Sequence, residues 1–156
     1  MMYDVDVVAV PAQPLVVLGG RVPLAAIGER MRRLRELVAE AGLTPAGPIM
    51  GRFYEHDVSS PALRYEVCLP VEPLAGGSVP DEIGEARGEW VPHHHALQTV
   101  HRGPRDQMDD AVRALHEALE ALGYTASGPL TEIYEKDTSS RASSEPVTTL
   151  RLPYAR

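Results

Sequence analysis

The chain has 156 residues, of which 44% are hydrophobic and 24% are charged, with a formal net charge of −7. This balance favours one soluble globular domain, and the acidic charge disfavours general attraction to nucleic acid or to anionic membrane. A single cysteine excludes a disulfide framework. No apolar run approaches the roughly 20 residues that span a bilayer, and no export signal is recognisable. We therefore expect a cytoplasmic protein.

The first predicted elements are two strands and a helix. Residues 5–9 alternate apolar and polar, and the apolar run at 14–18 continues the extended pattern after a proline break. A helix is predicted over about 24–41, and Gly42 suits the left-handed position that ends a helix. The apolar stripe that predicts this helix has the spacing of one helix face and consists of Ile27, Met31, Leu34 and Val38.

Two further strands are predicted after this helix. RFYEHD begins at Arg52 and follows a Gly-Pro turn, and residues 63–69 alternate apolar with polar side chains. Cys68 belongs to this second strand without a His-Asp pattern beside it, so we interpret it as a buried structural thiol. Residues 73–84 have the composition of a loop.

The second half of the chain repeats the first. Val91-Pro92 follows Val10-Pro11 by 81 residues, and Gly128-Pro129 follows Gly47-Pro48 by the same offset. A second apolar stripe predicts a helix over about 105–122; its members are Met108, Val112, Leu115 and Leu119, with Gly123 at the end. TEIYEKD then predicts a strand, and residues 137–146 a loop.

We therefore predict an α+β fold built from duplicated βαββ units, with repeat 1 at about 1–75 and repeat 2 at about 83–156. Helices would cover one sheet face, and the units would pair around a pseudo-two-fold axis with a ligand groove between them. Because the repeats use the chain from near residue 3 to Tyr154, we expect a single domain over 1–156 and no separate DNA-binding domain.

Aligning Tyr54 with Tyr134 places Arg52 where the second copy has Glu132. Side chains alternate along a strand, so Glu132 and Tyr134 would point into the groove if Ile133 packs under the helix. A carboxylate beside aromatic rings suits a cationic or polarised organic ligand. Two alternatives are an ordinary surface carboxylate on an edge strand and an internal pair between Glu132 and Arg52.

In the first copy, Phe53 would pack inward while Arg52 and Tyr54 face the groove.

His93-His94-His95 forms a triplet in which at most two side chains share a strand face, and no second cluster supplies further ligands. We therefore predict no metal site.

The combination of H-x-G-P at 101–104, a helix, and G-P-x-x-E-x-Y at 128–134 resembles the second half of the GyrI-like (gyrase-inhibitor-like) small-molecule-binding domain. The segments VPAQPLVVL, AGLTPAGP and YEVCLPV resemble its first half, so the resemblance covers essentially the whole chain. It implies a cupped antiparallel sheet whose central groove carries an acidic residue at Glu132. The same domain is the effector-binding half of multidrug-sensing regulators of the MerR and AraC types.

The family often has an aromatic residue after H-x-G-P, where this chain has Arg105. This departure removes one ring from the expected lining and adds a cation near the groove mouth. The predicted ligand-binding residues are Arg52, Tyr54, Tyr65, Trp90, Arg105, Glu132 and Tyr134. Trp90 has a second interpretation, as a cover over one edge of the core.

The favoured function is a stand-alone binding module that captures apolar or aromatic, including cationic, organic molecules. It would need no cofactor and contact neither nucleic acid nor membrane, and transcriptional control would require a partner protein. The alternative is a hydrolase of reactive cyclopropane-bearing xenobiotics or natural products, as some GyrI-like proteins are, with Glu132 activating water or polarising the ligand. Arg105 in place of a ring counts against that enzyme. A protein-interaction role such as gyrase inhibition is a third possibility, which no motif supports.

Overall fold

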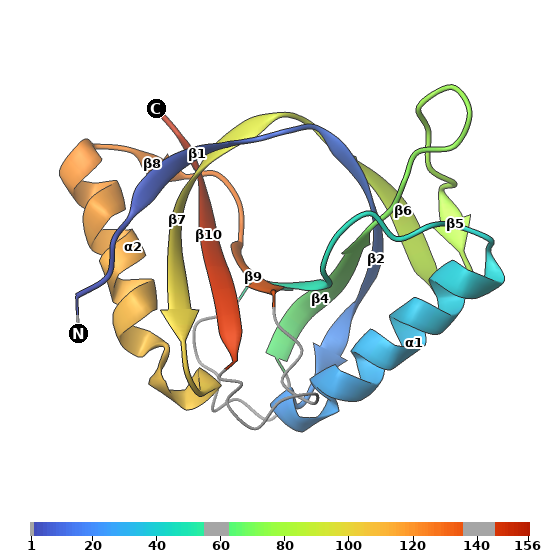
Figure 1. The fold of residues 1–156 in the computed structure, drawn as a ribbon, viewed down its shortest axis with the longest axis horizontal. Coiled ribbons are helices and arrows are strands. Elements are labelled where there is room, and N and C mark those ends of the chain that lie inside the picture. The colour runs from blue at the N-terminus through green and yellow to red at the C-terminus, as the bar shows by residue number, and fades with distance from the viewer. Residues whose placement is uncertain (1, 55–62, 136–145) are drawn as a thin grey trace. The chain divides into compact units, whose positions relative to one another are not determined.

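The structure is a computed structural model that describes residues 2–54, 63–135 and 146–156 (Figure 1). Over these ranges the chain forms ten strands with antiparallel pairing and two α-helices, which is the predicted α+β class. Residues 137–145 of the second predicted loop lie outside the described part. No helix within the three ranges is long and apolar enough to cross a membrane.

The strands are β1 (Asp6–Val10), β2 (Gln13–Val22), β3 (Met50–Phe53), β4 (Leu63–Pro70), β5 (Glu82–Ile83), β6 (Ala86–Val91), β7 (His94–Arg102), β8 (Thr125–Ala126), β9 (Leu130–Tyr134) and β10 (Val147–Ala155). The helices are α1 (Ile27–Glu40) and α2 (Asp109–Leu122). Short 3-10 turns precede them, η1 (Leu24–Ala26) and η2 (Arg105–Gln107).

Both predicted helices are confirmed, with each 3-10 turn filling the first residues of the expected span. Gly42 and Gly123 follow the helices with φ angles of 71° and 72°. This left-handed conformation costs glycine little, and it lets the chain turn away from the helix axis. The sequence did not predict β5, which lies inside the loop expected at 73–84.

The chain divides into two compact units, each containing one helix. The first-copy unit is Pro11–His93, and the second-copy unit is Met1–Val10 with His94–Arg156. The leading strand of each repeat has therefore changed partners: β1 pairs with β7, and β6 pairs with β2. Two-residue hairpins favour Asn-Gly or similar pairs, whereas Pro11-Ala12 and Pro92-His93 join these strands, so neither strand folds back on its successor.

In the first-copy unit, α1 packs on β2 and β4. Its buried face consists of Ile27, Leu34, Leu37 and Val38. Phe53 stacks on its register partner Tyr65 with ring centroids 5.9 Å apart, and Tyr65 is 2% exposed. Burial raises the pKa of Tyr65 even though the Arg30 guanidinium of α1 lies beside it and lowers that pKa. The inward packing expected of Phe53 is thus confirmed, on the α1 side of the strands.

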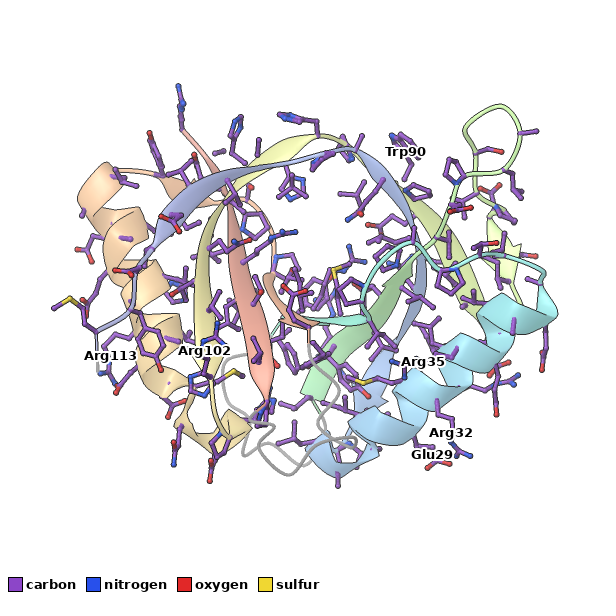
Figure 2. All side chains as sticks on the ribbon, viewed as in Figure 1. Glu29, Arg32, Arg35, Trp90, Arg102 and Arg113 are labelled. Carbon is purple, nitrogen blue, oxygen red and sulfur yellow. The ribbon has the colours of Figure 1, made fainter. Side chains whose placement is uncertain are left out.

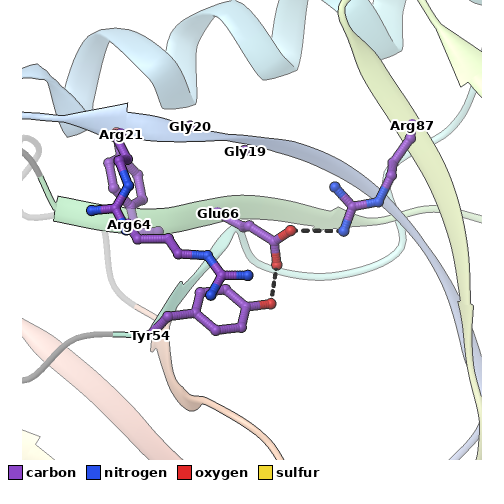
Figure 3. A pocket seen from close by; sticks show the side chains of 8 residues that line it. Gly19, Gly20, Arg21, Tyr54, Arg64, Glu66 and Arg87 are labelled. Carbon is purple, nitrogen blue, oxygen red and sulfur yellow. Dashed lines mark hydrogen bonds and ion pairs between the residues drawn. The ribbon is translucent and has the colours of Figure 1, made fainter.

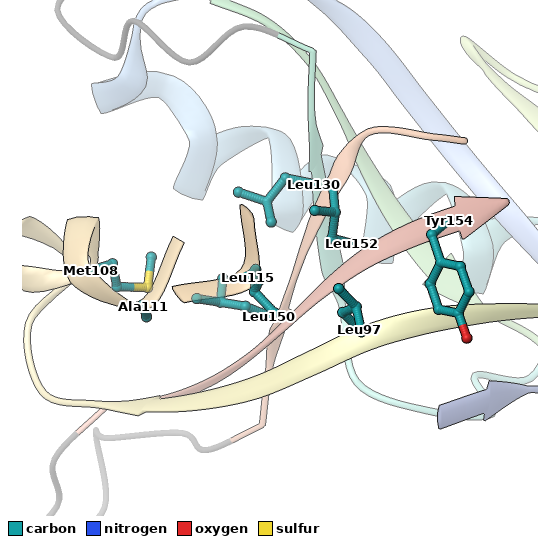
Figure 4. Packing of buried hydrophobic residues seen from close by; sticks show 8 residues of the cluster. All are labelled: Leu97, Met108, Ala111, Leu115, Leu130, Leu150, Leu152 and Tyr154. Carbon is teal, nitrogen blue, oxygen red and sulfur yellow. The ribbon is translucent and has the colours of Figure 1, made fainter. Parts of the chain in front are cut away.

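In the second-copy unit, the strand order is β1-β7-β10-β9, and β8 pairs with the end of β10. Helix α2 packs on β7 and β10. Figure 4 shows the core between them, which consists of Leu97, Met108, Ala111, Leu115, Leu130, Leu150, Leu152 and Tyr154.

Candidate functional site: a buried carboxylate and an arginine-lined cavity

Glu132 lies on the α2 side of β9. Strand alternation puts it on one face with Leu130, which belongs to the core under α2. Its register partner is Leu150, another member of that core, whereas Ile133 lies opposite Thr149 and takes the other face. The expectation that Ile133 packs under the helix is therefore wrong, and Glu132 takes that place.

The strand register explains this reversal. Gly51 pairs with Val67 in the first-copy unit, and Glu132 pairs with Leu150 in the second. Val67 and Leu150 are equivalent positions, because their partners on β2 and β7 are separated by the 81-residue repeat offset. Glu132 therefore corresponds to Gly51 rather than to Arg52. Aligning the tyrosines had shifted the comparison by one residue, which exchanges the two faces of a strand.

Three side chains form what we call the Glu132 cluster: Arg105, Glu132 and Tyr134. Arg105 Nη2 donates to Glu132 Oε2 at 2.9 Å, and the Tyr134 hydroxyl donates to Oε1 at 2.9 Å. Glu132 as a whole is 3% exposed, which excludes an ordinary surface carboxylate, whereas the Arg105 side chain is 34% exposed. The carboxylate is thus buried, while its counter-ion reaches in from the surface turn η2.

Desolvation dominates the electrostatics of this cluster. Burial raises the pKa of Glu132 above its ordinary value, although the Arg105 charge and the Tyr134 hydroxyl oppose that shift. Burial likewise raises the pKa of Tyr134, and the neighbouring carboxylate raises it further. A buried carboxylate of this kind is stabilised by any cation that reaches it, and it also accepts a proton more readily than an exposed one.

Arg52 belongs to a separate group, the four-charge cluster of Arg52, Glu66, Arg87 and Glu89. Arg52 lies opposite Glu66 in the register, pairs with it at 2.8 Å, and binds both carboxylate oxygens of Glu89 at 2.8 and 3.1 Å. Arg87 bridges the same two carboxylates at 2.7 and 3.1 Å. All four residues lie in the first-copy unit, whereas Glu132 takes Arg105 from its own unit. Arg52 is thus paired with Glu66 and Glu89, and Glu132 is paired with Arg105, in place of the suggested Arg52–Glu132 pair.

The predicted aromatic residues divide between the units. Tyr134 joins the Glu132 cluster, whereas Tyr54 donates its hydroxyl hydrogen bond to Glu66, and Tyr65 is buried beside Phe53. Trp90 belongs to β6, lies opposite Pro14 of β2 and is 50% exposed (Figure 2). Trp90 is therefore a half-exposed strand residue.

A cavity of about 470 Å³ opens beside the four-charge cluster in the first-copy unit (Figure 3). We call it the arginine pocket; its lining residues are Gly19, Gly20, Arg21, Tyr54, Arg64, Tyr65, Glu66 and Arg87. Its volume lies within the range of about 300–1,000 Å³ that is usual for small-molecule sites.

Sequence reasoning missed Glu66, Arg87 and Glu89. A signal was present, because Arg64 and Glu66 occupy the polar positions of an alternating strand, and Arg87 and Glu89 alternate in the same way. The strand exchange that brings β6 beside β2 was the missing information.

Within the described residues, no three His, Cys, Asp or Glu side chains gather as metal ligands. His94 and His95 begin β7, and the His95 ring lies 6.3 Å from that of Tyr154. The absence of bound metal from the purified protein remains a prediction.

Comparison with solved structures shows the same fold in other proteins. The crystal structure of the EcmrR C-terminal domain superposes with a TM-score of 0.85 at 20% identity, covering 100% of this chain and 99% of that one. In the EcmrR–DNA complex the TM-score is 0.84 at 19% identity, covering 99% of this chain, which spans 58% of that regulator chain.

Two more distant neighbours also share the fold. A hydrolase from Listeria innocua encoded by lin2189 has a TM-score of 0.70 at 16% identity, over 97% of this chain and 91% of that one. SAV2435 bound to tetraphenylphosphonium has a TM-score of 0.59 at 13% identity, over 99% and 94%. At these identities the likeness shows the fold alone.

No curated protein sequence matches the chain. The family model described as "GyrI-like small molecule binding domain" matches residues 3–155. Together with the duplicated strand–helix–strand–strand units, this match over nearly the whole length shows that the chain belongs to the GyrI-like family of small-molecule-binding domains.

Proposed function

We propose that the chain captures small aromatic organic cations at the Glu132 cluster. The observation that carries this proposal is the contrast in burial within one ion pair: the Glu132 side chain is 4% exposed and that of Arg105 is 34% exposed. A structure of SAV2435, which shares the fold, contains an aromatic cation, tetraphenylphosphonium.

A bound cation would replace Arg105 as the partner of Glu132. An ionised carboxylate buried without a partner is strongly unfavourable, so Arg105 holds this place in the free protein. Arg105 begins η2 at the surface, where its guanidinium is readily solvated once released. The free energy of ligand binding is therefore the difference between the energy of the ligand's own contacts and the energy of the contacts that Arg105 loses.

An aromatic cation suits this exchange better than a small hydrated ion. Leu130 and Leu150 lie beside Glu132 on the same face, so the surroundings of the carboxylate are apolar. Burying a ring there releases about 25 cal/mol for each Å² of apolar surface, which a metal ion or ammonium does not gain. Tyr134 retains its hydrogen bond to the carboxylate and offers a ring face to the positive charge.

Calorimetric titration with tetraphenylphosphonium and its neutral relative triphenylphosphine oxide tests the proposal. Glu132→Gln keeps the shape of the side chain and removes its charge. It should weaken binding of the cation by about 1–3 kcal/mol and leave binding of the neutral compound nearly unchanged. Arg105→Gln should strengthen binding of the cation, because Arg105 no longer competes with it for Glu132. Arg113→Gln is the matched control, since Arg113 pairs with Asp110 on the exposed face of α2.

Equal losses for the two compounds in Glu132→Gln would contradict the proposal, as would unchanged cation affinity in Arg105→Gln. The first result would mean that Glu132 only shapes the site. The second would mean that the ligand binds without displacing Arg105.

A hydrolase is the second candidate, and the raised pKa of the Glu132 carboxyl favours it, because burial prepares such a group for acid–base work. The test is product formation from a cyclopropane-bearing alkylating compound. Turnover that disappears in Glu132→Gln would support the enzyme, whereas binding without product would support the capture role alone.

A further inference from the structure

The turn that presents Arg105 to Glu132 is held from within the second-copy unit by His101. The His101 Nε2–H donates to the Pro104 carbonyl at 2.9 Å, and the Tyr3 hydroxyl bonds to His101 Nδ1 at 2.8 Å. We call the Tyr3 hydroxyl, the His101 ring and the Pro104 carbonyl the histidine bridge. It connects the N-terminal segment to the residue that immediately precedes Arg105.

The Pro104 carbonyl determines which ring nitrogen of His101 carries a hydrogen. A carbonyl oxygen only accepts hydrogen bonds, so Nε2 is the donor in this contact. In a neutral ring Nδ1 is then the acceptor, and the Tyr3 hydroxyl donates to it. His101 is 2% exposed, so a ring nitrogen that loses its partner is left buried and unsatisfied, which is unfavourable.

The same carbonyl controls the direction in which Arg105 leaves the turn. It belongs to the peptide plane between Pro104 and Arg105, and it also accepts a hydrogen bond from the Gln107 amide at 3.1 Å. The two donors together restrict the rotation of that plane. Because Arg105 is the first residue of η2, the orientation of the plane sets where its side chain starts toward Glu132.

The backbone holds the turn at a second point. The Gly103 amide donates to the Pro146 carbonyl at 2.9 Å, and Gly103 has a φ angle of 120°, a conformation that favours glycine. Whereas this attachment is made by the backbone, His101 and Tyr3 hold the turn through their side chains. A substitution can therefore remove the histidine bridge and leave the backbone contact in place.

The N-terminal segment is itself fixed to the second-copy unit. Thr99 Oγ1 donates to the Asp4 carbonyl at 2.8 Å, and Tyr3 and Val5 pack against the core under α2. Thr99 lies two residues before His101 on the same face of β7 and is also 2% exposed. The Tyr3 hydroxyl is thus held at a defined position beside the His101 ring.

A cavity of about 420 Å³ lies beside the histidine bridge. Tyr3 and His101 line it together with Asp106 and Gln107 of η2. Close-packed side chains resist displacement, whereas open space beside η2 lets the turn shift without displacing the core under α2. The hydrogen bonds of the histidine bridge therefore contribute directly to holding the turn in place.

We propose that His101 is a positioning residue for the Glu132 cluster, and that it controls ligand affinity by holding Arg105 against the carboxylate. The effect on affinity rests on the proposed function, whereas the coupling of His101 to the Arg105–Glu132 pair exists without a ligand. Weakening the histidine bridge releases Arg105 and so raises the fraction of protein in which Glu132 is open to a cation. The candidate site thereby extends to the N-terminal segment.

The side-chain carboxyl ¹³C resonance of Glu132 measures this coupling in the ligand-free full chain. Arg105→Gln should move the titration of this resonance to higher pH, because the arginine charge opposes the rise in the Glu132 pKa. His101→Phe keeps a ring and removes both hydrogen bonds, so it should move the titration in the same direction by a smaller amount. Tyr3→Phe should move it less again. His101→Gln retains a donor toward Pro104 and should restore the wild-type titration.

Val38→Ala is the control for general loosening of the fold, because Val38 is a buried α1 residue of the first-copy unit. It should lower the Tm without moving the Glu132 titration. Equal movement of the titration in Val38→Ala and His101→Phe would overturn the inference. So would a wild-type titration in His101→Phe, whether or not Arg105→Gln shows its shift.

Calorimetry with tetraphenylphosphonium, at a pH above the Glu132 titration of each variant, separates this inference from the proposed function. His101→Phe should bind the cation about threefold more tightly than the wild type, the scale expected for the loss of one net hydrogen bond. Tighter binding in Arg105→Gln with unchanged binding in His101→Phe would keep the capture function and refute the role of His101. The expected shifts in the Glu132 titration without cation binding by any variant would support the positioning role and contradict the capture function.

Discussion

Leu150 lies directly opposite Glu132 in the pairing of β9 with β10, so a core leucine and a buried carboxylate share one face of the second-copy unit. This pairing explains why Glu132 is desolvated and why Arg105 approaches it from the turn before α2. It also determines how the stability of the protein should respond to pH.

Glu132→Gln should gain stability relative to the wild type as the pH rises above about 4.5, the ordinary pKa of a glutamate. The folded protein holds the Glu132 proton more tightly than the unfolded chain, because the pKa is raised by burial. The favourable contribution of this proton is complete below the unfolded pKa and is lost as the pH rises through the folded pKa. Glutamine cannot ionise, so the variant avoids that loss.

Urea denaturation of both proteins between pH 4 and pH 8 measures this difference. Glu29→Gln serves as the control, because Glu29 lies on the exposed face of α1 and should show no comparable trend. A stability difference between Glu132→Gln and the wild type that stays constant with pH would contradict the raised pKa.

Arg52→Gln should destabilise the protein by about 1.5–3 kcal/mol, since it removes charge-assisted hydrogen bonds to Glu66 and Glu89 and leaves Arg87 as their remaining arginine partner. The Arg52 and Glu66 side chains are each 13% exposed, and Arg52 also holds Glu89 with two hydrogen bonds. Arg32→Gln removes an exposed pair and should change the free energy of unfolding by less than about 0.5 kcal/mol. Similar losses in the two variants, measured by urea denaturation, would refute the structural role of Arg52.

Gly88→Ala should be strongly destabilising, whereas Gly28→Ala should be neutral or stabilising. A Cβ atom at Gly88 would lie 1.9 Å from the Pro80 carbonyl oxygen, a backbone atom that cannot move without displacing the chain. At Gly28, within α1, nothing lies within 4 Å of the added atom, and alanine is favoured over glycine in a helix by about 0.5–1 kcal/mol. Thermal melting of both variants checks the contrast, which equal shifts in Tm would disprove.

Cys68 should resist thiol reagents in the folded protein and react fully after denaturation. It is 0% exposed, and burial raises the pKa of its thiol to about 12, so neither access nor thiolate is available at neutral pH. The reaction of Cys68 with a disulfide reagent is monitored by absorbance, first in buffer and then in guanidinium chloride. Rapid reaction in buffer alone would show that β4 opens easily.

Much of the fold follows from the sequence because its signals are local. The two apolar stripes have helical spacing, and Gly42 and Gly123 mark the ends of both helices, so the helices could be predicted within a few residues. The duplication was visible in the 81-residue offset, and the alternation at 63–69 predicted β4. Cys68 was recognised as a buried thiol for the same reason.

Only the tertiary structure decided which strand lies beside which, and in what register. The exchange of β1 and β6 brings Glu89 beside Arg52, a contact that no spacing within one repeat reveals. A one-residue difference in register moves Glu132 from the predicted face of β9 to the opposite one, since side chains alternate with a period of two. Sequence patterns specify which residues form a strand, whereas the side of the sheet and the partners of each charge depend on packing against elements far away in the chain.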